Sequence, residues 1–204
     1  MNEYSFLVGG AMARDDKREI ILQATLELVA EHGFHGCPCA LIAERAGVAA
    51  GTIYRYFENK DVLINALYLE LESKLSASIL TGYSPEMPFR ERFVHLVTGL
   101  LEYFIAAPLE FRFIEQFHHS PYGVAFRKDR MLTQPEGKSC SAYSELLQQG
   151  VAQQVIKDLP LVLLFDLAFG PVISVARNHI LGFITLDESL IRRVAEACWD
   201  SLKR

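Results

Sequence analysis

Apolar side chains recur at three- and four-residue intervals along most of the chain, and the two-residue alternation of a half-buried strand is never sustained. In the first such segment, Ile20, Ile21, Ala24 and Leu28 fall on one helical face. The pattern therefore predicts an all-α protein. The predicted helices span residues 14–31, 38–45, 50–56, 60–80, 89–107, 109–119, 139–156, 160–182 and 188–202.

Small residues and capping residues mark several helix boundaries. Gly33 suits the position after a helix, where a left-handed backbone is common. Asn59, Asp158 and Asp187 are candidate N-caps, because a short side chain with an oxygen can accept from the free N–H groups of a first turn. The Ser-Pro-Tyr-Gly segment at 120–123 predicts a turn.

Three short helices within the first 57 residues carry the most informative motif. The second and third are separated only by a few residues around Gly47, which can take the positive φ that a sharp turn between helices needs. Ala43 is small where the two helices must cross closely. The apolar residues that would fix this crossing are Ile42, Ala46, Val48 and Ile53. The arrangement is typical of a helix-turn-helix.

The third of these helices has an outer face suited to DNA. Ala50 and Gly51 leave room for a phosphate at its N-terminus, where free N–H groups and the helix dipole favour an anion. Tyr54 and Tyr56 offer hydroxyl groups, and Arg55 offers a forked donor that matches guanine. These side chains predict phosphate and base contacts.

Residues 17–67 resemble the tetracycline-repressor (TetR) family of transcription regulators. The resemblance rests on Phe34, Ile42-Ala43, Ala46-Gly47-Val48, Gly51-Thr52-Ile53-Tyr54-Arg55-Tyr56-Phe57, Asn59-Lys60 and Leu63. It implies a helix-turn-helix domain at 14–59, then a C-terminal ligand-binding and dimerisation domain at 60–204, which begins with a connecting helix at 60–81. It also implies a homodimer on palindromic double-stranded operator DNA, acting as a repressor that a small molecule releases.

The resemblance also implies roles for individual residues. Thr52, Tyr56 and Lys60 match phosphate-contacting positions, while Ala50, Gly51, Tyr54 and Arg55 match positions near the bases. Two features depart from the family pattern. The segment Cys37-Pro38-Cys39 stands where a Ser or Thr usually caps the second helix, and Ala49 stands where a Ser commonly contacts phosphate.

Charge does not by itself indicate a nucleic-acid partner. The net charge is −5 with a pI near 5.7, whereas nucleic-acid binding usually leaves a basic footprint. The first 60 residues hold six basic and eight acidic side chains. DNA binding must therefore depend on local geometry rather than on bulk attraction.

Two segments bear on membranes and assembly. Residues 1–13 contain Glu3 and no Lys or Arg, so we expect a flexible extension rather than a secretory signal. Residues 159–176 are apolar but contain Asp166, which would be costly in lipid. We therefore expect no membrane span. Instead, we expect the helices 160–182 and 188–202 to pair with those of a second copy as a four-helix bundle in a cytoplasmic homodimer.

Aromatic residues are concentrated in the middle of the C-terminal region, where most of them are expected in the core. If the family resemblance holds, some instead line a cavity for an apolar or aromatic effector. The residues proposed to contact it are Phe104, Phe117, His118, Tyr122, Tyr143, Phe169 and Arg177.

Other chemistry is less well supported. Glu115 and His118 lie at i and i+3, as in di-metal helical bundles, and with His119 they define an alternative helical enzyme or metalloprotein. Cys37 and Cys39, with Cys140 or Cys198, define an alternative redox or metal sensor, although their spacing is not typical of zinc sites. We expect no catalytic residues, no cofactor and no metal.

Overall fold

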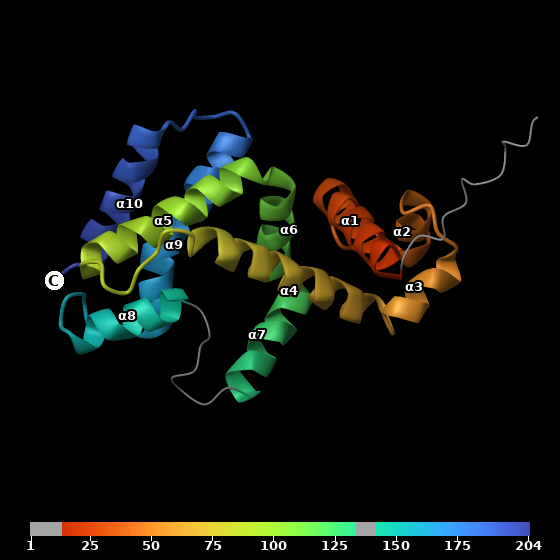
Figure 1. Ribbon diagram of the computed structural model, residues 1–204, viewed down its shortest axis with the longest axis horizontal. Helices are drawn as coiled ribbons and strands as arrows, with labels where there is room; N and C mark the ends of the chain where they lie inside the picture. Colours follow the sequence, from red (N-terminus) through yellow and green to blue (C-terminus); the bar gives the residue numbers. More distant parts are fainter. Residues whose placement is uncertain (1–13, 134–141) are drawn as a thin grey trace, which may run out of the picture. The chain divides into compact units, whose positions relative to one another are not determined.

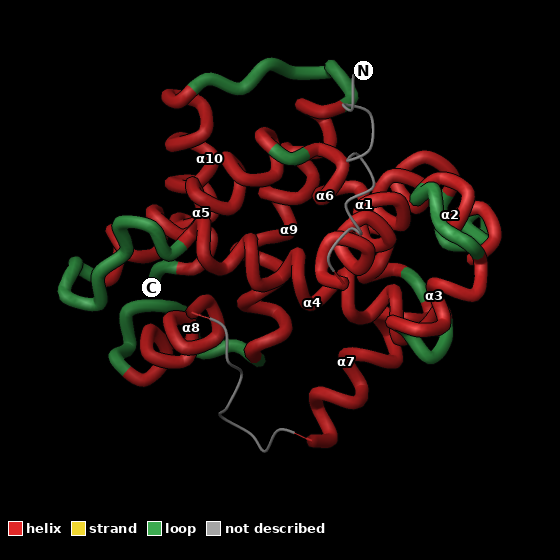
Figure 2. The backbone as a smooth tube through the Cα atoms, turned by 45° about the vertical axis from the view of Figure 1, so that its right-hand side comes forward, coloured by secondary structure: helices red, strands yellow, loops and turns green. Residues whose placement is uncertain are grey.

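The computed structural model describes residues 14–133 and 142–204, and the predicted extension at 1–13 lies outside this part of the chain. The described residues form ten helices and no strand, which confirms the all-α prediction (Figure 2). The helices are α1 (Arg14–His32), α2 (Cys39–Arg45), α3 (Ala50–Tyr56), α4 (Lys60–Ile79), α5 (Phe89–Ala106), α6 (Pro108–His119), α7 (Pro121–Thr133), α8 (Ala142–Ala152), α9 (Leu161–Ile180) and α10 (Glu188–Leu202).

The chain forms two compact units, and the first contains α1, α2, α3 and the start of α4, up to Leu67. In this unit α2 packs against both α1 and α3. Leu28 of α1, Ile42 of α2 and Ile53 of α3 are almost completely buried and form its centre. The unit ends inside α4, so the functional division between residues 59 and 60 stays a prediction.

The second unit begins at Tyr68, and its centre is formed by α5, α9 and α10, which pack against one another (Figure 1). Helix α6 contacts α5 and α7, and α8 contacts α5 and α9. Helix α10 has a narrow buried face at helical spacing, which includes Ile191, Ala195, Cys198 and Leu202. Burial of this face against α5 and α9 positions the C-terminal helix.

One helix was not predicted. Residues 120–123 were expected to form a turn, but α7 begins at Pro121. The fixed φ of proline suits the first position of a helix, where its missing N–H is not needed. The Oγ atom of Ser120 accepts a hydrogen bond from the backbone N–H of Gly123 at 3.2 Å. Ser-Pro therefore begins a helix here, and the predicted turn is wrong.

The predicted caps have mixed outcomes. Asn59 Oδ1 accepts from the N–H of Val62 at 2.9 Å, and Asp187 Oδ1 accepts from the N–H of Leu190 at 2.7 Å, so both caps are confirmed. The cap predicted at Asp158 is wrong, because Pro160 occupies the N-cap position of α9 and no side chain caps that helix. A side chain two residues further back is not at the position from which capping occurs.

The prediction for α8 was too long at its C-terminal end. The helix ends at Ala152 rather than at residue 156, and Gln154 then takes a positive φ of 58°. Ile156 forms an isolated antiparallel bridge with Lys203. Residues 139–141, also predicted as helix, lie outside the described part of the chain.

Helix α9 is long and apolar enough to cross a membrane by length and composition, and only 22% of its most apolar stretch is buried within a single chain. Val162, Leu163 and Leu167 are among its exposed side chains. An apolar helix that a single chain leaves largely uncovered needs an apolar neighbour.

Candidate nucleic-acid interface

The turn between α2 and α3 has the geometry predicted from the sequence. Helix α2 ends at Arg45, Ala46 is its C-cap, and Gly47 follows with φ at 64°. The N–H of Val48 donates to the carbonyl of Ala43 at 2.9 Å, which closes the turn. Because a side chain at this φ would be strained, glycine allows the reversal that brings α3 against α2.

Helix α3 buries one face and exposes the other. Ile53 and, just beyond the helix, Phe57 are buried, and the guanidinium of Arg18 lies 5.8 Å from the centre of the Phe57 ring. These contacts determine which way the helix is turned about its axis. The predicted DNA-contacting residues of α3 divide accordingly: Ala50, Gly51, Tyr54 and Arg55 are exposed, while Thr52 and Tyr56 are half-buried.

The exposed face is open enough for a close partner. A Cβ atom added at Gly51 would meet no atom within 4 Å, so glycine is not required there for packing within the unit. Tyr54 exposes 58% of its surface, and Arg55 extends beside it from the same helix. A guanidinium and a phenol that project together from a small helix are suited to base edges and phosphates.

A contact that the sequence did not indicate links Tyr54 to α2. A hydrogen bond with the side chain of Cys39 raises the pKa of Tyr54 above its usual value. Cys39 is the first residue of α2. The cysteine therefore contacts the outward-facing tyrosine. The N-cap residue of α2 is Pro38, and its side chain makes no cap hydrogen bond.

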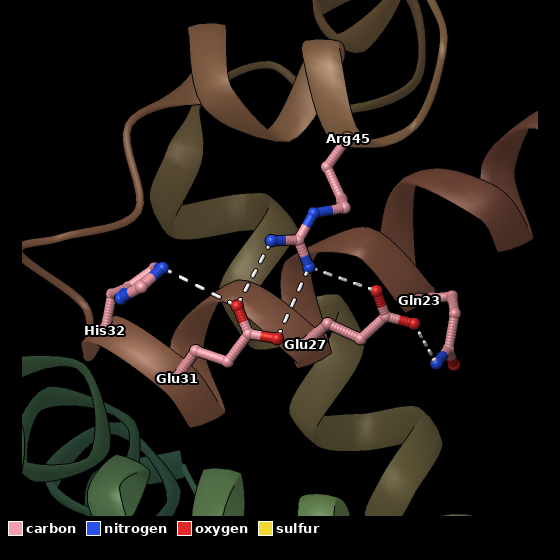
Figure 3. Close-up of polar contacts among 5 residues, drawn as sticks. All are labelled: Gln23, Glu27, Glu31, His32 and Arg45. Atoms are coloured by element: carbon pink, nitrogen blue, oxygen red, sulfur yellow. Dashed lines mark hydrogen bonds and ion pairs between the residues drawn. The ribbon is translucent and has the colours of Figure 1, made fainter.

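Arg45 is exposed, and its guanidinium links α2 to α1 (Figure 3). Its guanidinium contacts Glu27 at 3.3 Å and Glu31 at 3.1 Å, both on α1. The hydrogen bond from Arg45 lowers the pKa of Glu31, and the same bond raises that of Arg45. A second donor, Gln23, reaches the other oxygen of Glu27 at 2.9 Å. This surface network ties the last residue of α2 to α1.

Lys60 is already engaged within the first unit. Its Nζ donates to the backbone carbonyl of Phe34 at 2.6 Å, so it joins the start of α4 to the segment that follows α1. The sequence predicts a phosphate contact for this ammonium. A lysine can donate more than one hydrogen bond, so the phosphate contact stays a prediction beside a structural role that the structure reveals.

The residues predicted to bind an effector lie in separate aromatic contacts of the second unit. Phe117 stacks on Tyr68 with ring centres 4.0 Å apart, and His118 meets the edge of the same tyrosine at 5.6 Å. The other predicted residues pair elsewhere: Phe104 with Phe111, Tyr143 with Phe169, and Arg177 with the carboxylate of Glu115. Tyr122 is half-buried at the start of α7.

His118 belongs to the largest of these clusters, which contains Tyr68, Phe113, Phe117, His118 and Phe126. Burial, and then the nearby charge of Arg127, lower the pKa of His118 to about 4. The imidazole is therefore neutral at pH 7 and can accept or donate one hydrogen bond without a counter-ion.

The residues of the metalloprotein alternative do not converge. Glu115 is held by Arg177, and Nδ1 of His119 lies 2.8 Å from the backbone carbonyl of Glu115 rather than from a shared metal position. His118 packs against aromatic rings. Across residues 14–133 and 142–204, no group of three or more His, Cys, Asp or Glu side chains is arranged to hold a metal ion.

The thiols of the cysteine alternative are poorly placed for sensing. Burial raises the pKa of both Cys37 and Cys198 to about 11, so each is a neutral thiol at physiological pH. The thiolate is the form that reacts with oxidants and binds metals. Cys39 is partly exposed and contacts Tyr54, as described above. Cys140 lies outside the described residues.

The geometry defines the class of the first unit. Two seven-residue helices joined by a glycine turn, with an exposed tyrosine and arginine on the second, form a helix-turn-helix DNA-binding domain. Family models match both units: residues 21–67 match "Bacterial regulatory proteins, tetR family", and residues 88–203 match "Tetracyclin repressor-like, C-terminal domain". The chain belongs to the TetR family of helix-turn-helix transcription regulators.

Relatives and solved structures agree with this assignment. An uncharacterised helix-turn-helix regulator from Haemophilus influenzae is 24% identical over 94% of this chain and 98% of its own. A TetR-family regulator structure from Vibrio parahaemolyticus is 30% identical, with a TM-score of 0.72 over 93% of this chain and 99% of its own. The repressor KstR from Mycolicibacterium smegmatis is 39% identical, but over only 37% of this chain and 39% of that repressor.

Proposed function

We propose that this chain is a cytoplasmic transcriptional repressor that binds a palindromic operator as a homodimer and is released by a small apolar or aromatic effector. The observation that carries the proposal is the outward face of α3, with Tyr54 and Arg55 exposed beside an unobstructed Gly51. The acidic net charge of −5 means that affinity must come from this local surface.

Within this proposal, α3 lies in the major groove. Ala50, Gly51, Tyr54 and Arg55 approach base edges, whereas Thr52, Tyr56 and Lys60 contact phosphates. The guanidinium of Arg55 is the strongest candidate for reading guanine, because its two parallel donors match O6 and N7. Arg45 is assigned no DNA contact, since its donors are directed to Glu27 and Glu31.

The homodimer is supported by an apolar groove between α9 and α10. The groove has a volume of about 230 Å³ and is lined by Pro171, Val175, Val194, Ala197, Cys198 and Ser201. A continuous apolar ridge runs along α9, because apolar residues follow one another there at four-residue intervals: Leu163, Leu167, Pro171 and Val175. The last two of these residues also line the groove. A second copy with the same ridge and groove covers this face by two-fold symmetry.

The effector is proposed to bind among the aromatic side chains of the second unit, and the cluster around His118 is its most suitable place. Rings there can accept an apolar body, and the neutral imidazole offers one polar contact. Phe117 already stacks on Tyr68, so an effector must separate rings that now touch. Such a rearrangement could change operator affinity 5- to 150-fold, at a coupling free energy of about 1–3 kcal/mol.

The decisive experiment is a salt titration of binding to DNA upstream of the gene and to random DNA, for the wild type and for Arg55→Ala. We expect Arg55→Ala to lose about 1–3 kcal/mol of operator binding and to relax the preference at one base pair, because a bidentate base contact is removed. Arg112→Ala is the matched control, since Arg112 is exposed on α6 in the other unit. Operator binding that is equally tight in wild type and Arg55→Ala would overturn the role of Arg55.

A further inference from the structure

A hollow of about 320 Å³ lies on the surface of the second unit, outside the aromatic clusters and the groove between α9 and α10. Its lining residues are Met87, Arg90, Glu91, Val94, His95 and Arg192. They come from the segment before α5, from the first two turns of α5 and from the first turns of α10. The hollow therefore combines an apolar surface, from Met87 and Val94, with two guanidinium groups, one imidazole and one carboxylate, that of Glu91.

These two guanidinium groups share a single carboxylate. Arg90 and Arg192 contact the same oxygen, Oε1 of Glu196, at 3.4 Å and 3.5 Å. Both distances are long for charge-assisted hydrogen bonds, and both arginine side chains are about half exposed or more. One oxygen cannot satisfy the forked donors of two arginines. Each guanidinium therefore keeps N–H groups for a further acceptor.

The start of α5 has a net positive charge beside the hollow, because Glu91 offsets only one of its two arginines. Arg90 and Arg92 both lie in its first turn, where the helix dipole disfavours cations, and the N-cap residue Pro88 offers no side-chain oxygen. Arg92 is only 7% exposed. Its partners are Gln149 Oε1 at 2.8 Å and the ring of Phe89 at 5.4 Å, and its Nε has no hydrogen-bond partner.

This arrangement of arginines is unfavourable for the stability of the folded chain, and packing does not explain it. A buried guanidinium without a carboxylate partner is unfavourable. The two arginines of the first turn outnumber its one acidic residue, Glu91, so they add to the positive potential there. Arg90 and Arg192 do not bury apolar surface to compensate, because they remain exposed. An anion in the hollow would oppose this potential and satisfy the free donors.

We propose that the hollow binds a small organic anion, with its carboxylate between Arg90 and Arg192 and its apolar body on Met87 and Val94. The site remains accessible in the proposed homodimer. Arg192 and the groove residue Val194 are two positions apart on α10, which places them on opposite sides of the helix, about 200° apart. The anion site is thus independent of the dimer surface and of the proposed effector cluster.

The single tryptophan of the chain reports on this site. Trp199 of α10 contacts two rings of α5, Phe89 at 5.9 Å and Phe93 at 5.6 Å between ring centres. It follows Arg192 by seven residues, so it lies on the same side of α10. A ligand held between α5 and α10 should therefore change the emission of Trp199 in the wild-type protein.

The test uses the full-length protein and a matched pair of probes, hydrocinnamate and the neutral hydrocinnamyl alcohol. Binding is followed by Trp199 emission and by calorimetry, for the wild type, the double variant Arg90→Gln with Arg192→Gln, and the control Arg193→Gln. Arg193 is exposed on α10 and does not line the hollow. All variants are compared by circular dichroism to confirm that they are folded.

We expect saturable binding of hydrocinnamate to the wild type and to Arg193→Gln, with affinity at least about tenfold weaker for the double variant and for the alcohol. Equal affinity of carboxylate and alcohol would show that only apolar contact matters and would overturn the proposal. Undiminished binding in the folded double variant, or no saturable binding of hydrocinnamate to the wild type, would overturn it equally. None of these outcomes depends on operator binding, so they leave the proposed repressor function to its own test.

Discussion

The two compact units of this protein direct their side chains toward different tasks. In the first, α2 and α3 are only seven residues long, and the residues proposed to act lie on the surface, where neighbouring positions in the sequence stay neighbours in space. In the second, helices of up to 20 residues enclose aromatic rings that come from distant positions, such as Tyr68 and Phe117. The first unit presents its chemistry outward, and the second holds most of its chemistry inside.

This difference explains why one unit is easier to interpret than the other. Gly47, Ile53 and Arg55 are related by the geometry of a short turn and a short helix, so spacing alone assigns each a role. An aromatic residue of the second unit has no such local constraint. Phe117 is completely buried, and whether it serves as core or as ligand wall depends on which rings reach it across the unit.

The largest expected effect comes from a substitution in the proposed dimer surface of the second unit. Val175→Glu would place a carboxylate in the apolar groove of each protomer, at a cost of about 3 kcal/mol or more if it stays buried. We expect monomers and loss of operator binding, because two half-sites need two subunits. Analytical ultracentrifugation and a gel-shift assay measure both effects.

The matched control is Val124→Glu, since Val124 is 40% exposed on α7 and does not line the groove. It should remain a dimer with normal operator affinity. A wild type that is monomeric at micromolar concentration would contradict the proposed interface. If Val175→Glu remained dimeric, the interface would lie elsewhere on the chain.

The second prediction concerns the interior of the second unit. The pKa of His118 is about 4 in the folded chain and near 6.5 when unfolded, so the unfolded state binds more protons between these values. Stability is therefore fully present above pH 6.5 and is lost as the pH falls toward 4, by up to about 3 kcal/mol. His118→Phe should lack this loss.

Urea unfolding followed by Trp199 emission, between pH 7 and pH 4, compares wild type with His118→Phe. Acidic groups titrate in both proteins, so the difference between the two curves isolates the imidazole. Parallel curves would contradict a buried, neutral His118. The single tryptophan lies in the second unit, so this experiment measures the unfolding of that unit alone.

The smallest expected effect concerns the first unit. Lys60→Met removes the hydrogen bond to the carbonyl of Phe34 and should lower the stability of this unit by about 1–2 kcal/mol. Hydrogen exchange of the α1 and α2 amides measures this change. Lys74→Met is the control, because Lys74 is exposed on α4 and pairs with Glu70 at a distance of 3.8 Å. Unchanged exchange rates in Lys60→Met would contradict the structural role.

A salt titration of the same variant tests its predicted phosphate contact. Loss of one phosphate contact should lower the slope of log affinity against log salt by about one unit. An unchanged slope together with faster exchange would assign Lys60 to the fold alone. A lower slope together with normal exchange would assign it to DNA alone.

The sequence by itself determined the elements whose rules are local. Apolar spacing gave the helical fold, Gly47 gave the turn, and Asn59 and Asp187 gave two caps, because each depends on a few consecutive residues. The motif at residues 17–67 was recognisable for the same reason. Local rules also failed in particular places: Ser120 and Pro121 begin a helix although the same residues are common in turns.

Only the tertiary structure decided which side chains of separate helices meet. It directed Arg45 to two carboxylates of α1, engaged Lys60 with the carbonyl of Phe34, and placed Arg90 and Arg192 on one oxygen of Glu196. Arg192 and Glu196 are four positions apart on α10, but the other pairs are separated by 14 to 106 positions. No local spacing specifies them, because the packing of buried faces fixes how helices are turned and so which polar groups are brought together.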